Sequence, residues 1–460
     1  MAHSVDFLNQ SIEEYLDSHE QKEIIRFIAC GSVDDGKSSL IGRLLYDSQK
    51  VFDDQLKDIK TEADLALLLD GLESEIEQGI TIDVAYKYFS TKKKKYIIAD
   101  TPGHDQYTRN MATGASTADV AVILIDARKG LLHQTKRHSY IVSLLGIKKF
   151  IIAINKIDLV DYAEDIFEEI KREYQKIIPN LENFEAIEFD YIPVSALHGD
   201  NVVNLSIKTP WYKGKPIMEL LDNLSIMKKS NEVFIFPVQY INRPNSNFRA
   251  YCGSIVSGEL YQGDEIIVLP SKKRTNVQKI ISQNMESSVS SVSAKMAVSI
   301  ILEDELDISR GDVIVKNDRD VRLSASVNAI ILWMNEEAMN CTQSYIIKLS
   351  SSIVNGVISE IEYKKDLNTF GEITVNELHL NDIAMCKVEF DRKIVCTPYK
   401  EYKELGSFII IDRYTNETLG VGMIDLIDEN QDNIIEYTDD DRRLNKYIRK
   451  KYPEWNCREI

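Results

Sequence analysis

The chain has 460 residues, of which 44% are hydrophobic and 28% charged, and this length predicts roughly three domains. Its formal net charge of −18 argues against non-specific affinity for nucleic acid or for an anionic membrane. The six cysteines include no CxxC pair, and the N-terminal residues 1–21 are acidic and amphipathic, unlike a secretory signal. We therefore expect a reducing, cytoplasmic location, with neither membrane nor nucleic acid as a partner.

An apolar run at residues 24–30 leads into a glycine loop and then into a segment of helical character. The loop and its flank consist of Gly31, Ser32, Val33, Asp34, Asp35, Gly36, Lys37, Ser38 and Ser39. This is the spacing of a P-loop, in which glycines let backbone N–H groups turn toward phosphates. Lys37 can reach the β- and γ-phosphates, and the Ser38 hydroxyl can ligate Mg²⁺. The segment predicts a site for a nucleoside triphosphate.

A long acidic connection over residues 47–77 leads to Gly79, Ile80, Thr81 and Ile82. The Thr81 hydroxyl can ligate Mg²⁺, and its amide can contact a γ-phosphate. We expect this loop to order around the nucleoside triphosphate and to loosen after hydrolysis.

Two apolar runs then flank a basic stretch at residues 92–95, which predicts the turn of a hairpin. The second run ends in Asp100, Thr101, Pro102, Gly103 and His104. A carboxylate at the carboxyl end of a parallel strand suits a metal, so we expect Asp100 to hold a water of the Mg²⁺ shell. The Gly103 amide, with no side chain in the way, can approach the γ-phosphate.

A further apolar run at residues 150–154 ends in Asn155, Lys156, Ile157 and Asp158. The Asp158 carboxylate can accept from the N1 and N2 hydrogens of guanine, whereas adenine presents the wrong donors and acceptors. Asn155 can bond the base edge, and the stem of Lys156 can lie over the purine. Farther along, a backbone amide for the guanine oxygen can come from Ser195, Ala196 and Leu197. Together these motifs predict a GTPase.

The pattern of the whole chain predicts a multidomain α/β and β fold. Apolar runs alternate with helical patterns such as 133–145 and 161–177, which indicates a P-loop GTPase domain with a mostly parallel sheet and flanking helices. From Glu232 onward, short strands broken by glycine indicate two β-barrels. The expected parts are a GTPase domain with an N-terminal extension over 1–226, barrels over 227–320 and 321–427, and a C-terminal extension over 428–460 with a short helix at 444–452.

Residues 24 to about 425 resemble the translation-factor class of GTPases, of which elongation factor Tu is the familiar member. That class typically has a histidine where this chain has Asp35. The P-loop sequence of this chain, GSVDDGKSSLIGRLLYDS, instead resembles that of the GTPase subunits of bacterial sulfate adenylyltransferases. The stretches QGITIDVAY at 78–86 and YTRNMATGAS at 107–116 resemble the same family.

The resemblance implies the large subunit of an enzyme that makes adenosine 5′-phosphosulfate and pyrophosphate from ATP and sulfate, coupled to hydrolysis of GTP. It implies GTP and Mg²⁺ as ligands. It also implies a smaller, ATP-pyrophosphatase-like partner subunit that performs the adenylyl transfer, in agreement with the single P-loop of this chain. His104 would orient the attacking water. The alternative is a Tu-like factor that delivers aminoacylated tRNA, with GTP as a timer.

Overall fold

The computed structural model describes residues 22–47, 83–225, 233–245, 248–282, 288–317, 319, 321–341 and 343–427, with Asn445, Tyr447, Arg449 and Lys451. The chain divides into two compact units, Met1–Lys229 with Lys365–Ile373, and Ser230–Lys364 with Thr374–Ile460. Each unit is described by itself. The predicted four-part division remains a prediction.

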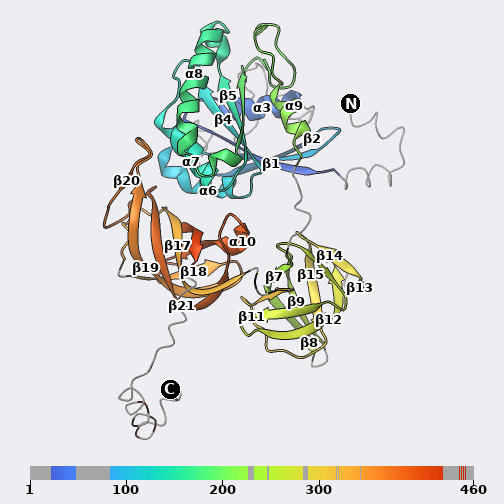
Figure 1. Cartoon of the computed structure of the whole chain (residues 1–460). Coiled ribbons are helices and arrows are strands. Elements are labelled where there is room, and N and C mark those ends of the chain that lie inside the picture. The colour runs from blue at the N-terminus through green and yellow to red at the C-terminus, as the bar shows by residue number, and fades with distance from the viewer. Residues whose placement is uncertain are drawn as a thin grey trace, which may run out of the picture. The chain divides into compact units, whose positions relative to one another are not determined.

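The first unit is built around a six-stranded sheet with the strand order β2-β3-β1-β4-β5-β6 (Figure 1). The strands are β1 (Ile24–Gly31), β2 (Ala85–Ser90), β3 (Lys95–Asp100), β4 (Val120–Asp126), β5 (Lys149–Asn155) and β6 (Glu188–Pro193). All neighbours pair in parallel except β2 and β3, which form the antiparallel hairpin expected at residues 92–95. All seven residues of β4 are buried, as expected for a strand covered on both faces.

Helices cover both faces of this sheet. They are α3 (Lys37–Asp47), α6 (Thr108–Ser116), α7 (His133–Leu144), α8 (Glu164–Ile177) and α9 (Ile217–Asn223), with short 3-10 turns at Asp105–Tyr107, Ile157–Val160, Ile178–Asn180 and Phe184–Ala186. Leu40 and Leu44 of α3 share a core cluster with Phe27 and Ile98. Helix α6 packs against Ala99 of β3, because a Cβ added at Gly114 would lie 3.3 Å from the Ala99 Cβ. Because successive residues of a strand point to opposite faces, α3 and α6 lie on opposite sides of the sheet.

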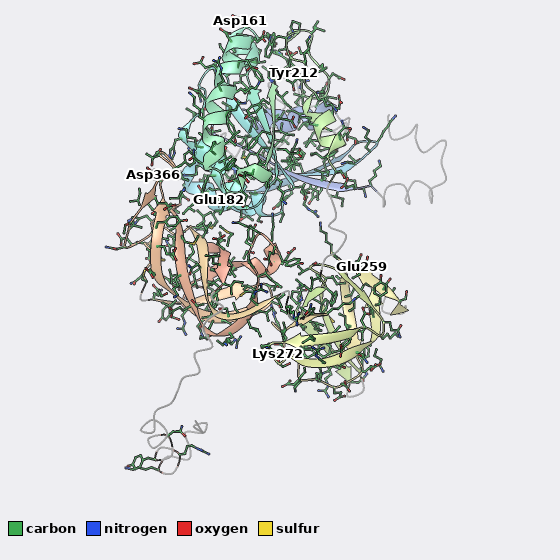
Figure 2. All side chains as sticks on the ribbon, in the orientation of Figure 1. Asp161, Glu182, Tyr212, Glu259, Lys272 and Asp366 are labelled. Atoms are coloured by element: carbon green, nitrogen blue, oxygen red, sulfur yellow. The ribbon has the colours of Figure 1, made fainter. Side chains whose placement is uncertain are left out.

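Helix α8 begins three residues later than the sequence pattern predicts. Asp161 and Tyr162 have φ of 53° and 55°, in the left-handed region, so the chain cannot enter a right-handed helix before residue 163. Figure 2 labels Asp161 at this point. Strand β6 is also displaced, because Glu188 already pairs with Lys149 of β5 and the strand ends at Pro193.

The second unit begins with a β-sheet that curves around its own core. Its strands are β7 (Ile235–Pro237), β8 (Tyr240–Asn245), β9 (Phe248–Ser254), β10 (Glu259–Tyr261), β11 (Glu265–Leu269), β12 (Lys273–Ser282), β13 (Ser288–Val289), β14 (Ser291–Ser293), β15 (Ala297–Leu302) and β16 (Val313–Val315). The main path is β7-β16-β11-β12-β15-β9-β8, and β10 pairs separately with β14.

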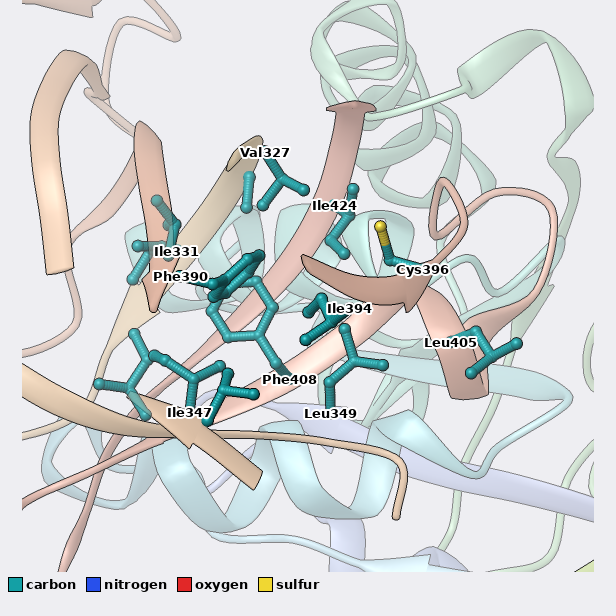
Figure 3. Packing of buried hydrophobic residues seen from close by; sticks show 14 of the residues in the cluster. Val327, Ile331, Ile347, Leu349, Phe390, Ile394, Cys396, Leu405, Phe408 and Ile424 are labelled. Atoms are coloured by element: carbon teal, nitrogen blue, oxygen red, sulfur yellow. The ribbon is translucent and has the colours of Figure 1, made fainter. Parts of the chain in front are cut away.

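Six of the remaining strands form a closed ring. They are β17 (Arg322–Trp333), β18 (Ser344–Leu349), β19 (Ser352–Lys365), β21 (Ile383–Cys396), β22 (Ser407–Ile411) and β23 (Thr418–Ile427), with the short helix α10 (Lys403–Gly406). The short strand β20 (Glu372–Ile373) belongs to the stretch Lys365–Ile373 of the first unit. Strand β18 pairs with both β22 and β19, which closes the sheet. Figure 3 shows the interior of the ring, where Phe390 and Phe408 pack edge to face with their ring centroids 6.4 Å apart. The predicted fold class is confirmed.

Strand β11 is buried on both of its faces. Ile266 and Val268 belong to the core of the β7–β16 sheet, whereas Ile267 and Leu269 belong to the larger cluster that includes the ring interior. This shared packing explains why both barrels fall into one compact unit.

The extensions are described only in small part. Within the predicted helix at 444–452, Asn445, Tyr447, Arg449 and Lys451 are helical, and its other residues lie outside the described residues. The N-terminal residues 1–21 also lie outside them. Within the described part of the chain, no helix is both long and apolar enough to cross a membrane.

Candidate nucleotide site

The P-loop connects the end of β1 to the first turn of α3. Gly36 has a φ of +90°, and a Cβ there would lie 2.4 Å from the Asn155 Nδ2, so only glycine fits. Asp35 is 1% exposed, and its Oδ2 accepts the Ser32 amide at 2.7 Å. Burial raises the pKa of Asp35, and the Lys37 ammonium opposes this. The Asp35 side chain therefore closes the loop on itself.

Lys37 lies folded over the loop. Its Nζ donates to the carbonyl oxygens of Gly31 at 3.0 Å and Ser32 at 2.8 Å. Burial lowers the pKa of Lys37, and the carboxylates of Asp100 and Asp35 act in the opposite direction. A buried ammonium whose described hydrogen bonds go to two neutral carbonyls is a strong partner for an incoming phosphate. Ser38 and Ser39 follow it in the first turn of α3 and are partly exposed.

The Asp100–His104 segment reaches the P-loop from the next strand. A Cβ at Gly103 would lie 2.6 Å from Lys37 Nζ and 3.0 Å from the Val33 amide nitrogen, so a side chain here would push away either Lys37 or the segment. Asp100, at the end of β3, is 3% exposed, and its charge acts on Lys37. The two motifs therefore lie side by side at the carboxyl ends of β1 and β3.

Asn155 joins the P-loop to the Ser195–Leu197 loop. Its Nδ2 donates to the Asp35 carbonyl at 2.7 Å, and its Oδ1 accepts the Ala196 amide at 2.9 Å. One amide hydrogen and one oxygen lone pair remain for a base edge. The Ser195 and Ala196 amides both donate to acceptors within the protein, whereas the Leu197 amide has no acceptor among the described residues.

Lys156 crosses from the end of β5 to the P-loop. Its Nζ donates to the Asp34 carbonyl and lies 3.1 Å from Asp126 Oδ2. Lys156 and Asp34 both have left-handed φ, 59° and 65°.

Asp158 lies beside the Ser195–Leu197 loop. The side chain is 12% exposed, and its Oδ2 lies 3.9 Å from the His198 Nε2. Arg43 of α3 supports the same loop by donating to the carbonyls of Ala196, at 3.4 Å, and Leu197. The four segments thus converge at the carboxyl edge of the sheet, where open α/β sheets bind ligands.

Comparison with known proteins places the chain in a family. The elongation factor Tu GTP binding domain family matches residues 22–228, and the GTP-eEF1A C-terminal domain-like family matches residues 326–425. The chain is 50% identical over 471 residues to sulfate adenylyltransferase subunit 1 of Sulfurovum sp. (strain NBC37-1), with 98% of each chain covered. It is 50% identical over 463 residues to that of Aliarcobacter butzleri (strain RM4018), covering 98% of this chain and 97% of the relative. The chain belongs to the sulfate adenylyltransferase subunit 1 family.

The match over residues 22–228 shows that the chain carries a GTP-binding domain of the elongation factor Tu type. His104 follows Gly103 and is partly buried, with its ring edge-on to Tyr107 at 6.3 Å between centroids. Thr81, the candidate of the nucleotide-dependent loop, lies outside the described residues.

The donor groups at the site fit Mg²⁺. The Ser38 hydroxyl and the Asp100 carboxylate are hard oxygen ligands, and Mg²⁺ in nucleotide sites is bound through one or two carboxylates together with the phosphates. The described residues contain no cluster of three or more His, Cys, Asp or Glu side chains that could hold a metal ion.

Asp126 and Arg128 lie beside Lys156 at the same edge of the sheet, and the sequence did not predict them as part of the candidate site. Arg128 binds Asp126 through Nε at 3.0 Å and through a second nitrogen at 2.6 Å, and Asp126 in turn holds Lys156. Burial alone would raise the pKa of Asp126, but Arg128 and Lys156 lower it to about 2. The sequence signal that could have identified Asp126 is a carboxylate at the end of β4, the strand between β1, which leads into the P-loop, and β5, which leads into the Asn155–Asp158 motif.

Proposed function

We propose that this chain is the GTP-hydrolysing large subunit of sulfate adenylyltransferase, which couples GTP cleavage to the formation of adenosine 5′-phosphosulfate and pyrophosphate. The adenylyl transfer from ATP to sulfate takes place on a smaller, ATP-pyrophosphatase-like subunit. The observation that carries the proposal is the convergence of the P-loop, Asp100–His104 and guanine motifs on one sheet edge, in a chain that aligns end to end with named subunits 1.

Each group of residues binds a different part of the nucleotide and its metal ion. Asp158 and the Leu197 amide recognise guanine, and the Lys156 stem covers the purine. Lys37 and the amides of the P-loop bind the phosphates, so the nucleotide replaces the carbonyls that Lys37 now contacts. Ser38, Thr81 and Asp100 would hold Mg²⁺, which neutralises charge on the β- and γ-phosphate oxygens when bound.

His104 orients the water for hydrolysis. A ring nitrogen accepts a hydrogen from a water placed in line with the γ-phosphate, as the water-positioning glutamine does in other GTPases. The Gly103 amide, next to Lys37, can bind the γ-phosphate before cleavage and release it afterwards. The loss of that contact is the signal that the proposed coupling transmits.

The proposed location is the cytoplasm. Cys30, Cys252, Cys341, Cys386 and Cys396 are all free thiols, which supports a reducing compartment.

The test is pyrophosphate release from ATP and sulfate by this chain together with the smaller subunit, and by each alone. We expect release that depends on GTP and occurs only in the complex. His104→Ala should retain GTP affinity, lower GTP hydrolysis by about 100-fold and remove the GTP-driven release in proportion. A complex that never forms adenosine 5′-phosphosulfate, while the chain binds GTP and aminoacylated tRNA, would contradict the proposal and favour a carrier.

A further inference from the structure

Three charged side chains form a row across the carboxyl ends of β4 and β5. Asp126, the last residue of β4, pairs in register with Asn155 of β5, which places it next to Lys156. The Asp126 side chain is fully buried, whereas the side chains of Arg128 and Lys156 are 45% and 24% exposed. The row therefore has a buried anion in the middle and a cation on each side.

Asp126 is bound on both of its oxygens. The backbone amide and Nε of Arg128 donate to Oδ1, both at 3.0 Å, and a terminal nitrogen of Arg128 donates to Oδ2 at 2.6 Å. The Lys156 Nζ lies 3.1 Å from the same Oδ2. A buried carboxylate that loses one of its cations is left partly uncompensated. Arg128 thus fixes the carboxylate that Lys156 contacts.

The same Lys156 ammonium also contacts the P-loop, because it donates to the Asp34 carbonyl. A Cβ at Gly36 would lie 3.8 Å from the Lys156 Cε, so the end of this side chain lies beside the loop backbone. Left-handed backbone, as at Lys156 and Asp34, is uncommon in residues other than glycine and persists where surrounding contacts hold it. Lys156 therefore joins the turn that carries Asp158 to the backbone of the P-loop.

Arg128 contacts neither of these two segments directly. Among the described residues its guanidinium bonds to Asp126 alone. Those bonds raise the pKa of Arg128, and the charges of Asp158 and Asp34 act in the same direction from farther away. The contacts of Arg128 thus reach the P-loop only through Asp126 and Lys156.

We propose that Asp126 and Arg128 are positioning residues that set how long a guanine nucleotide stays bound. The inference rests on the proposed function in taking a guanine nucleotide as the ligand. Arg128 fixes Asp126, and Asp126 fixes Lys156. Lys156 then holds the P-loop and the Asp158 turn in one arrangement. A nucleotide that contacts both segments leaves when they separate, so loss of this row speeds its release. The residues assigned to hydrolysis take no part in the row.

The experiment measures the dissociation of methylanthraniloyl-GDP from the full-length chain after addition of excess unlabelled GDP. Arg128→Met removes the guanidinium, and Asp126→Asn removes the carboxylate charge at nearly constant shape. We expect each variant to release the nucleotide at least about 10-fold faster, because each loses a charge-assisted hydrogen bond. Hydrolysis of bound GTP in a single turnover, with protein in excess, should stay within about 2-fold of the wild type. Arg128 is largely exposed, so Arg128→Met carries the test if Asp126→Asn does not fold.

Lys149→Met is the matched control. Lys149 begins β5, at the opposite end of the strand from the site, and pairs with Glu188 at 2.9 Å and Asp190 at 2.8 Å. Its loss should leave the release rate unchanged. Because Arg128 acts through Asp126, the double variant Asp126→Asn/Arg128→Met should release GDP no more than about 2-fold faster than Asp126→Asn alone. A larger increase would show that Arg128 acts on the nucleotide by itself, against the proposal.

The outcomes separate this proposal from the one it rests on. Faster release in the single variants, with hydrolysis and the control unchanged, supports the positioning role. Wild-type release rates in Arg128→Met and Asp126→Asn overturn it and leave the proposed function intact. Release and hydrolysis that change together also overturn it, because they indicate a general loss of structure. A wild-type chain that binds no guanine nucleotide removes the proposed function, and this inference with it.

Discussion

At the scale of single residues, Asn155 connects the parts of the nucleotide site. Its amide donates to the Asp35 carbonyl and accepts from Ala196, so one side chain fixes the P-loop relative to the guanine loop. Asn155→Ala removes two buried hydrogen bonds, each worth about 1 kcal/mol or more, and leaves their partners unsatisfied. We expect GTP affinity to fall about 30- to 100-fold in fluorescence titration.

The control for this variant is Asn355→Ala. Asn355 makes an exposed hydrogen bond to Asp391 in the ring of β17–β23 and should leave GTP affinity unchanged. Unaltered affinity in Asn155→Ala would mean that the two loops are held by other contacts.

His138 provides a pH-dependent test. It is 1% exposed on α7, its Nδ1 has no hydrogen-bond partner among the described residues, and burial lowers its pKa to about 3. In the unfolded chain the value is about 6.5, so the unfolded state takes up the proton first as the pH falls. Stability is therefore complete above about pH 6.5 and is lost toward pH 3, by about 1 kcal/mol between pH 6.5 and 5.5.

The measurement is the free energy of unfolding of the GTPase unit at these two pH values. His138→Leu should flatten the pH dependence by that amount, whereas the exposed His379→Leu should not. The same slope in all three proteins would show that His138 does not titrate as its burial requires.

At the scale of elements, the close approach of the Asp100–His104 segment to the P-loop should control hydrolysis. Gly103→Ala places a methyl group where Lys37 Nζ and the Val33 amide lie within 2.6 and 3.0 Å of its Cβ position. The segment must withdraw or Lys37 must move. We expect the GTP hydrolysis rate to fall at least about 10-fold, with the β1–β6 sheet intact by circular dichroism.

Gly371→Ala is the matched control, because the nearest atom to its added Cβ is a side-chain oxygen at 3.2 Å in an exposed turn. Equal hydrolysis rates for Gly103→Ala and wild type would indicate that the segment lies farther from Lys37 in the working enzyme.

The elements were largely predictable because their signals are local. The apolar runs ending in Gly31, Asp100 and Asn155 became parallel strands, and the basic stretch at 92–95 became a hairpin turn. The start of α8 was not predictable, since nothing in the residue types of Asp161 and Tyr162 requires left-handed backbone. The ion pairs of Asp126 with Arg128 and Lys156 were not predicted. They join the ends of two strands, and the spacing of residues along the sequence does not reveal which strands are neighbours in the sheet.

At the scale of the whole molecule, the central claim is that the energy of the nucleotide bound at this site drives adenylyl transfer on the partner subunit. The motifs around Asp158 give a way to change the nucleotide without changing the chemistry. Xanthine has a carbonyl oxygen where guanine has its 2-amino group. An asparagine amide can donate to that oxygen and accept from N1–H, so Asp158→Asn should exchange the preferred base.

The decisive measurement is pyrophosphate release from ATP and sulfate by the Asp158→Asn complex, supplied with either GTP or xanthosine triphosphate. The account predicts that the variant is driven by xanthosine triphosphate and responds to GTP about 100-fold less well, while the wild-type complex shows the reverse preference. Release that follows GTP equally in both complexes, or that needs neither nucleotide, would contradict it.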